Sequence, residues 1–169
     1  NSAGSLQSVG AVSDDQLAVR PGIVYTASGS AWIGLPPGDY TLYAGRGFEY
    51  SLATARLSLE QGAERQLTLT IHREVDTRGY VACDPHVHTL THSGHGDATA
   101  LERMITLAGE GIELPITTEH NRHVDLEPLA QTMKLDSRFT PVIGNEVTTP
   151  VGHFNIFPVA PGAAVPDHT

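Results

Sequence analysis

Histidine is the residue type that points to chemistry in this chain of 169 residues, because five of the nine histidines lie between positions 86 and 120. His86 and His88 follow a short apolar segment and are two residues apart, so on a strand both imidazoles point to one face. A divalent metal ion needs several donor atoms at about 2.0–2.2 Å. We therefore predict a metal site to which His86 and His88 contribute two donors.

Further candidate ligands lie at the ends of three later apolar segments. They are His120, Glu146 and His153. A lone histidine at a strand end is usually a surface or core residue, but His or Glu at four successive strand ends is hard to explain without a metal. We predict that Glu146 bridges two cations. We also predict that Asp84 accepts an imidazole N–H from outside the metal ligands and fixes its tautomer.

The segments that carry these residues alternate between strand and helix patterns. A capping box at Thr99 and Glu102 begins a helix with one apolar face. The alternation predicts parallel β-α units, in which functional residues lie at the carboxyl ends of the strands. The predicted strands are 79–83, 112–118, 140–144 and 153–157, and the predicted helices are 99–108 and 124–135.

The first 76 residues have a different pattern, with short runs of β-branched and aromatic residues separated by Gly and Pro. This pattern predicts a small antiparallel β-sandwich of four to six strands. It contains no cluster of His or charged residues, so we expect a structural or binding role. The expected domains are 1–76 and 77–169, and the predicted strands of the first are 23–26, 31–35, 40–44, 57–59 and 66–71.

Four segments resemble, in order, successive motifs of the PHP (polymerase and histidinol phosphatase) family. They are 84–89 (DPHVHT), 118–121 (TEHN), 144–146 (GNE) and 152–155 (GHFN). The resemblance is strongest to the carbaryl-hydrolase-like branch, whose members often carry a β-sandwich ahead of the metal domain. Residues 35–42 (LPPGDYTL) similarly resemble a turn of carboxypeptidase regulatory-like, transthyretin-type sandwiches.

The resemblance implies a fold that is α/β plus all-β, with a sandwich followed by the first half of a distorted (β/α)7 barrel. The family's last metal motifs lie beyond the length of this chain, so we expect an amino-terminal fragment of a larger enzyme. The open edges of a half barrel predict self-association or pairing with the missing carboxyl-terminal half.

The family also implies two or three divalent ions, usually Zn, Mn or Fe. By this resemblance His86 and His88 bind one ion, and Glu146 bridges to a second ion that His153 also binds. His120 binds a third ion, or the partner ion, together with a residue from the loop after His88.

That loop is longer here than in the family, and Asp97, His95 or His92 could supply the ligand. We rank Asp97 slightly ahead of His95. Glu119 stands where the family usually has Asp, and we expect it to tune His120 from outside the ligands. Arg122 and His123 lie near the expected site and are most simply read as surface residues.

The implied function is a metal-dependent hydrolase in which a metal-bound hydroxide attacks a phosphoester, or an ester or amide, of a small-molecule substrate. Glu146 is the expected catalytic residue, and Asn121 and Arg122 would orient the substrate. One alternative is a non-catalytic metal-binding or carbohydrate-associated module. Another is an amidohydrolase-type barrel, which usually needs a metal-bridging lysine that Lys134 does not fit.

The amino-acid composition excludes several kinds of binding partner. Ten basic and nineteen acidic residues give a net charge of −9, which disfavours nucleic acid. No apolar run is long enough to cross a membrane. The one cysteine, Cys83, excludes an internal disulfide and a cysteine zinc cage. We expect no targeting peptide within the first ten residues, and the architecture of the branch favours a periplasmic or secreted protein over a cytoplasmic one.

Overall fold

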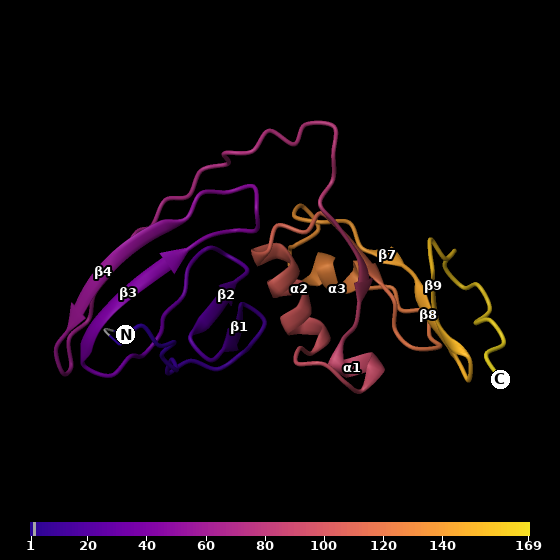
Figure 1. Ribbon diagram of the computed structural model, residues 1–169, viewed down its shortest axis with the longest axis horizontal. Coiled ribbons are helices and arrows are strands. Elements are labelled where there is room, and N and C mark those ends of the chain that lie inside the picture. The colour runs from indigo at the N-terminus through magenta and orange to yellow at the C-terminus, as the bar shows by residue number, and fades with distance from the viewer. Residues whose placement is uncertain (2) are drawn as a thin grey trace.

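The computed structural model describes residue 1 and residues 3–169, and it has a mixed α/β fold (Figure 1). The amino-terminal part forms two antiparallel two-stranded sheets. β1 (Leu17–Arg20) pairs with β2 (Ile23–Thr26), and β3 (Gly38–Ala44) pairs with β4 (Ala53–Leu59). Burial alternates along β4, as the predicted pattern of a half-buried strand requires.

Two of the predicted amino-terminal strands do not form. Residues 31–35 and 66–71 have the composition of strands, yet only isolated bridges occur there or nearby, at Gly34 and at Arg73. A strand needs a continuous ladder of hydrogen bonds to a neighbour, and an alternating pattern does not provide that neighbour. The described amino-terminal residues therefore form small separate sheets instead of one sandwich of four to six strands.

The second part is built on a parallel sheet with the order β5-β6-β7. β5 (Cys83–Val87), β6 (Leu114–Thr117) and β7 (Val142–Ile143) run in the same direction, which confirms the predicted parallel β-α units. β5 begins four residues later than predicted, so His86 lies within the strand and His88 follows directly after it.

An antiparallel hairpin of β8 (Asn145–Thr149) and β9 (Gly152–Ile156) follows the parallel sheet. β8 was not predicted as a strand of its own. A parallel bridge between His120 and Glu146 joins the chain after β6 to β8. Among the described residues no sheet closes into a barrel.

Three helices connect these strands. α1 (Leu90–Ser93) lies in a stretch predicted as loop, where Thr89 caps its amino terminus. α2 (Ala100–Gly109) begins with the predicted capping box, which is thereby confirmed, and α3 (Glu127–Thr132) is shorter than its prediction. None of the helices in the described residues is long and apolar enough to cross a membrane.

The main hydrophobic core lies around α2, which Figure 1 places between the β1–β2 sheet and α3. Met104 and Ile105 of α2 are fully buried, and Val87 of β5 packs in the same cluster. Ala18 of β1 is also a fully buried member of this cluster. The β1–β2 sheet and the α/β part therefore share one core across the boundary expected at residue 76.

Replacing Thr99 with alanine is expected to lower the free energy of unfolding by about 1 kcal/mol, the usual cost of losing such a cap. The Thr99 hydroxyl accepts the backbone N–H of Glu102 at 3.3 Å, and the Glu102 carboxylate accepts the N–H of Thr99 at 2.9 Å. Urea unfolding measures the difference. Thr68 is exposed, so T68A serves as the control, and equal losses in the two variants would contradict the cap.

Candidate metal centre

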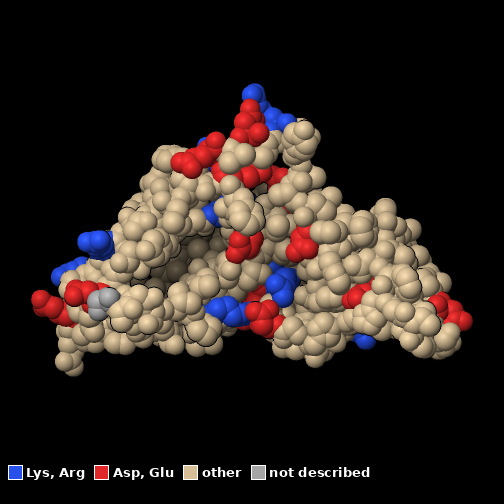
Figure 2. All heavy atoms as spheres, in the orientation of Figure 1, with Lys and Arg blue, Asp and Glu red and all other residues tan. Residues whose placement is uncertain are grey.

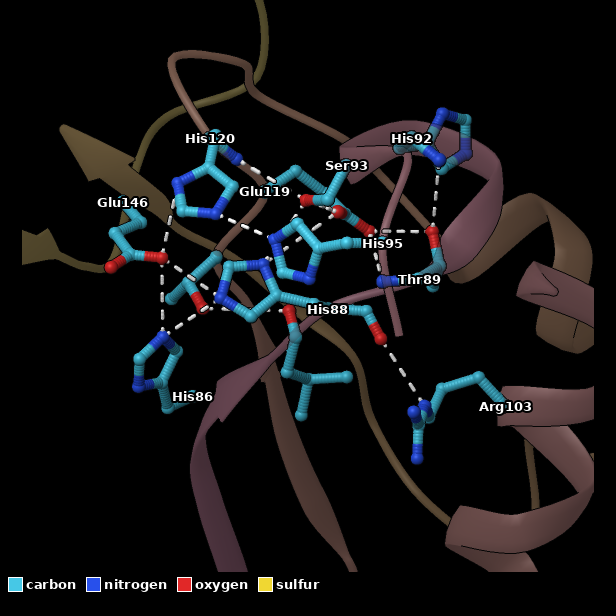
Figure 3. Close-up of polar contacts among 12 residues, drawn as sticks. His86, His88, Thr89, His92, Ser93, His95, Arg103, Glu119, His120 and Glu146 are labelled. Carbon is cyan, nitrogen blue, oxygen red and sulfur yellow. Dashed lines mark hydrogen bonds and ion pairs between the residues drawn. The ribbon is translucent and has the colours of Figure 1, made fainter. Parts of the chain in front are cut away.

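Imidazoles and one carboxylate from five separate segments gather beyond the carboxyl ends of β5 and β6. Figure 3 shows those of four of the segments, including Glu146. They surround an open depression of about 420 Å³. We call this set the His/Glu cluster, and its members are His86, His88, His95, His120, Glu146 and His153. The five ligands that the sequence placed on strand ends all belong to it.

Glu146 lies at the centre of the cluster and is only 5% exposed. Its Oε2 is 2.8 Å from His88 Nε2 and 3.3 Å from both His86 Nε2 and His120 Nδ1. Its Oε1 is 2.7 Å from His153 Nδ1. One carboxylate therefore contacts four imidazoles and belongs to two of the donor groups that could hold a metal ion.

The donor atoms form three overlapping groups, and within each group all donors lie within 4.8 Å of one another. The groups share members, since His88, His120 and Glu146 each belong to two of them. The three groups are His86 with His88 and Glu146, His88 with His95 and His120, and His120 with Glu146 and His153.

The spacing and type of these donors fit a divalent ion. His86 Nε2 lies 2.8 Å from His88 Nε2, and His95 Nε2 lies 2.7 Å from His120 Nε2. Ligands at about 2.0–2.1 Å from a tetrahedral zinc ion lie about 3.3 Å apart, so small adjustments open room for an ion. Imidazole and carboxylate donors suit Zn, Mn and Fe.

The electrostatics of the cluster favour the protonation states that metal ligation needs. Burial lowers the pKa of His88 below its ordinary value, despite the opposing attraction of Glu146. Burial alone would raise the pKa of Glu146, but hydrogen bonds from His153 and His86 outweigh it and hold that pKa below its usual range. A neutral imidazole and an ionised carboxylate are the ligating forms.

Glu119 is a fully buried carboxylate behind the cluster. It accepts the backbone N–H of Thr89 at 3.0 Å, the Thr89 hydroxyl at 2.7 Å and the hydroxyl of Ser93. Because Ser93 donates to Glu119, its oxygen can accept Nδ1–H of His88, which lies 3.1 Å away. This chain of bonds leaves Nε2 of His88 free to face the cluster.

We predicted that Glu119 would act on His120. In the structure Glu119 instead bonds Thr89 and Ser93, and Ser93 contacts His88. The Nδ1 of His120 instead lies 2.7 Å from the hydroxyl of Thr148. Sequence reasoning also missed Ser93. Thr89 and Ser93 are four residues apart and would share one helix face, but the glycines that follow favoured a loop.

Asp97 is not brought into the cluster. Its carboxylate forms ion pairs with Arg20 at 3.2 Å and Arg103 at 3.3 Å. His95 is the residue of this loop that joins the cluster, so the order in which we ranked the two is reversed. The ion pairs hold the Asp97 carboxylate away from the imidazoles, whereas Nε2 of His95 lies 2.7 Å from Nε2 of His120.

Three other expected site residues have different surroundings. The Asp84 carboxylate accepts the backbone N–H of His86 at 3.1 Å and contacts no imidazole. The Asn121 side chain bonds the backbone of Thr148, accepting at 2.8 Å and donating at 3.2 Å, so it holds β8 in place instead of facing a substrate. Arg122 is exposed.

The remaining histidines near the site lie outside the three donor groups. His92 is on α1, and its ring lies away from the cluster in Figure 3. The Nδ1 of His123 is 3.2 Å from the carbonyl oxygen of Ala163.

Comparison with protein-family models, curated proteins and solved structures found no significant match to this chain. What the cluster can do therefore follows from its own atoms. It offers five imidazoles and one shared carboxylate beside solvent, a donor set that can bind a metal ion.

Proposed function

We propose that this protein is a metal-dependent hydrolase related to the carbaryl-hydrolase-like branch of the PHP family. The observation that supports the proposal is the convergence of donors from five segments around Glu146. On this proposal the sheet β5-β6-β7 is the first part of a distorted (β/α)7 barrel, and the amino-terminal sheets correspond to the β-sandwich of that branch.

The three donor groups support a site for two or three divalent ions, for which we propose Zn, Mn or Fe. His86, His88 and Glu146 would hold the first ion. His120, Glu146 and His153 would hold a second ion. His95 and His120 would contribute to a third place, which His88 would not share because its Nε2 can ligate only one ion.

The residues of the chain serve this chemistry by holding donors, orienting them and leaving the site accessible. A bound divalent ion would supply Lewis acidity, lowering the pKa of water and neutralising charge on the oxygens of a phosphoester, ester or amide. Glu146 contributes the one negative charge within the ring of imidazoles. Ser93 keeps His88 in the ligating tautomer.

The open mouth of the cluster fits a small-molecule substrate. The side chains of His86 and His153 are 47% and 52% exposed, so a substrate oxygen can reach the donors without movement of the backbone. No arginine lines the depression. Because a phosphatase needs cationic groups around its phosphate, we give ester and amide substrates equal standing with phosphoesters.

The test begins with protein stripped of metal by a chelator and reloaded with Zn, Mn or Fe. Bound metal is measured by inductively coupled plasma mass spectrometry, and turnover is followed with p-nitrophenyl phosphate and p-nitrophenyl acetate. We expect metal-dependent hydrolysis of one substrate, lost when both His86 and His88 become alanine. His72 lies outside the donor groups, so H72A is the matched control. Full activity without bound metal would contradict the proposal.

The second candidate is a metal-binding module without catalysis. The openness of the depression favours it, because no closed barrel surrounds the site in the described residues. Tight metal binding without turnover of any of these substrates would support this alternative over the hydrolase.

A further inference from the structure

We propose that Arg20, in the amino-terminal β1–β2 sheet, is a positioning residue that holds the candidate ligand His95 in the His/Glu cluster. The inference rests on the proposed metal binding, and it deepens it by giving the amino-terminal part a role in the site. The exposed loop that carries His95 does not by itself fix the position of this residue.

His95 lies in an exposed loop between two glycines. Gly94 has φ of 73° and Gly96 has φ of 93°, a region that residues with side chains rarely adopt. Such a loop has many accessible conformations, so its ligand needs an external support to stay near His120. One support is the hydrogen bond from the backbone N–H of Leu90 to the carbonyl of Ala98, which closes the far end of the loop at 2.7 Å.

The other support comes from Arg20, which is distant in the sequence. Its Nε lies 3.2 Å from Asp97 Oδ2, and its Nη2 donates to the backbone carbonyl of the same residue. Side chain and backbone of Asp97 are therefore held by one guanidinium group, two residues from His95. The Arg20 side chain is 21% exposed, whereas the Asp97 side chain is 73% exposed.

Arg20 is itself fixed on its other side. Its Nη1 lies 3.0 Å from Glu102 Oε1 and donates to the carbonyl of Val19 at 2.8 Å. Burial would raise the pKa of Glu102, but hydrogen bonds that include those from Thr99 and Arg20 lower it to about 2. Glu102 is thus ionised at neutral pH and joins Arg20 to the first turn of α2.

Arg103 connects Asp97 to a second candidate ligand, His88. Arg103 Nη2 lies 3.3 Å from Asp97 Oδ1, and Arg103 Nε donates to the backbone carbonyl of His88 at 3.2 Å. In Figure 2 basic and acidic side chains meet between β1 and α2, at the centre of the face shown. One group of ion pairs therefore links the amino-terminal sheet to the backbone of His88 and, through Asp97, to the loop that carries His95.

The β1–β2 sheet is rigid enough to provide this support. Ala18 is fully buried in the core, and the Tyr25 hydroxyl donates to Glu110 Oε1 at 2.8 Å. The docking is tight, because a Cβ atom at Gly109 would lie 2.7 Å from Tyr25 Cδ1. These contacts hold the backbone of β1 against α2, so the Arg20 side chain starts from a fixed place beside the loop.

The test measures zinc affinity with a competing chelator, and coordination by the absorption spectrum of the cobalt-substituted protein. Because residues that orient metal ligands usually contribute 10- to 100-fold to affinity, we expect Arg20→Met to weaken one class of site by that factor and to change the cobalt bands. Arg20→Lys, which keeps the charge but loses the planar fork, should restore only part of the affinity. Arg56 is exposed on β4, and R56M is the matched control.

A double-mutant comparison separates positioning from a general loss of structure. His95→Ala should weaken the same class of site, and adding R20M should weaken it little further, because the two changes remove one effect. The losses of zinc affinity caused by R20M and by H86A should instead add, because the two changes remove different effects. If R20M reduces the yield of folded protein, Asp97→Asn weakens the contact from the other side by removing the negative charge of the ion pair.

Three outcomes decide the matter. Unchanged zinc affinity in both R20M and D97N would overturn the positioning role while leaving the hydrolase proposal intact. Full additivity of R20M with H95A would overturn it as well. Absence of metal binding by the unaltered protein would overturn both proposals, whereas metal binding that depends on Arg20 without hydrolysis would support the positioning role alone.

Discussion

Replacing Glu146 with glutamine is expected to lower zinc affinity at least about 100-fold. The Glu146 oxygens lie within 3.3 Å of four imidazole nitrogens, and the carboxylate belongs to two of the three donor groups. The amide removes the only negative charge among these donors and replaces one oxygen with an NH₂ group that cannot ligate. Changes outside the ligand set already cost 10- to 100-fold, so loss of a bridging ligand should cost more. Competition with a chromophoric chelator measures the affinity.

The matched control is Glu60→Gln. Glu60 is exposed, and E60Q changes the net charge by the same amount as E146Q. Equal weakening by E60Q and E146Q would show that overall charge, and not the carboxylate in the cluster, sets the affinity. The unaltered protein should also release zinc as the pH falls through the range in which its histidines become protonated, because only neutral imidazoles ligate.

The ligands on strands could be predicted because strand geometry is local. His86 and His88 share one face through the two-residue period of a strand. Glu146 needed one further step, the rule that functional residues lie at the carboxyl ends of parallel strands, because it follows the end of β7. His153 instead reaches the cluster from β9 of the antiparallel hairpin, which the rule does not describe.

The choice between Asp97 and His95 could not be made in this way. Both residues lie in a loop with glycines, and which side chain faces the cluster depends on contacts with distant residues. Arg20 binds Asp97 from 77 positions away in the sequence, and that pairing leaves His95 to face His120. No local pattern contains this information.

The prediction of a sandwich was incomplete for the same reason. A local pattern indicates a strand, but contacts with distant residues decide whether that strand pairs. Alternating residues in 66–71 satisfy the requirement for a strand but not the requirement for a partner. The apolar residues of β1 and β2 instead found their partner in α2, so the two expected domains share a core. The capping box at Thr99 was predictable to the residue, because every atom it uses lies within four positions.

Replacing Glu119 with glutamine is expected to lower the free energy of unfolding by about 2–3 kcal/mol. This is the usual cost when a buried donor loses its hydrogen bond to a charged acceptor. Glu119 is fully buried and accepts three hydrogen bonds, two from Thr89 and one from Ser93. An amide nitrogen cannot accept, so at least one donor loses its partner. Urea unfolding of metal-free protein measures the loss, and E60Q provides the control for the loss of one charge.

Ser93→Ala distinguishes the two roles of this buried carboxylate. The variant keeps both bonds from Thr89 to Glu119, so its stability should fall by no more than about 1 kcal/mol. It removes the acceptor for Nδ1–H of His88, so zinc affinity should fall about 10-fold or more, as it does when such support is lost elsewhere. If S93A lowered stability as much as E119Q and left zinc affinity unchanged, Ser93 and Glu119 would serve only the fold. A loss of affinity greater than the loss of stability would instead show that the buried pair fixes the tautomer of a metal ligand.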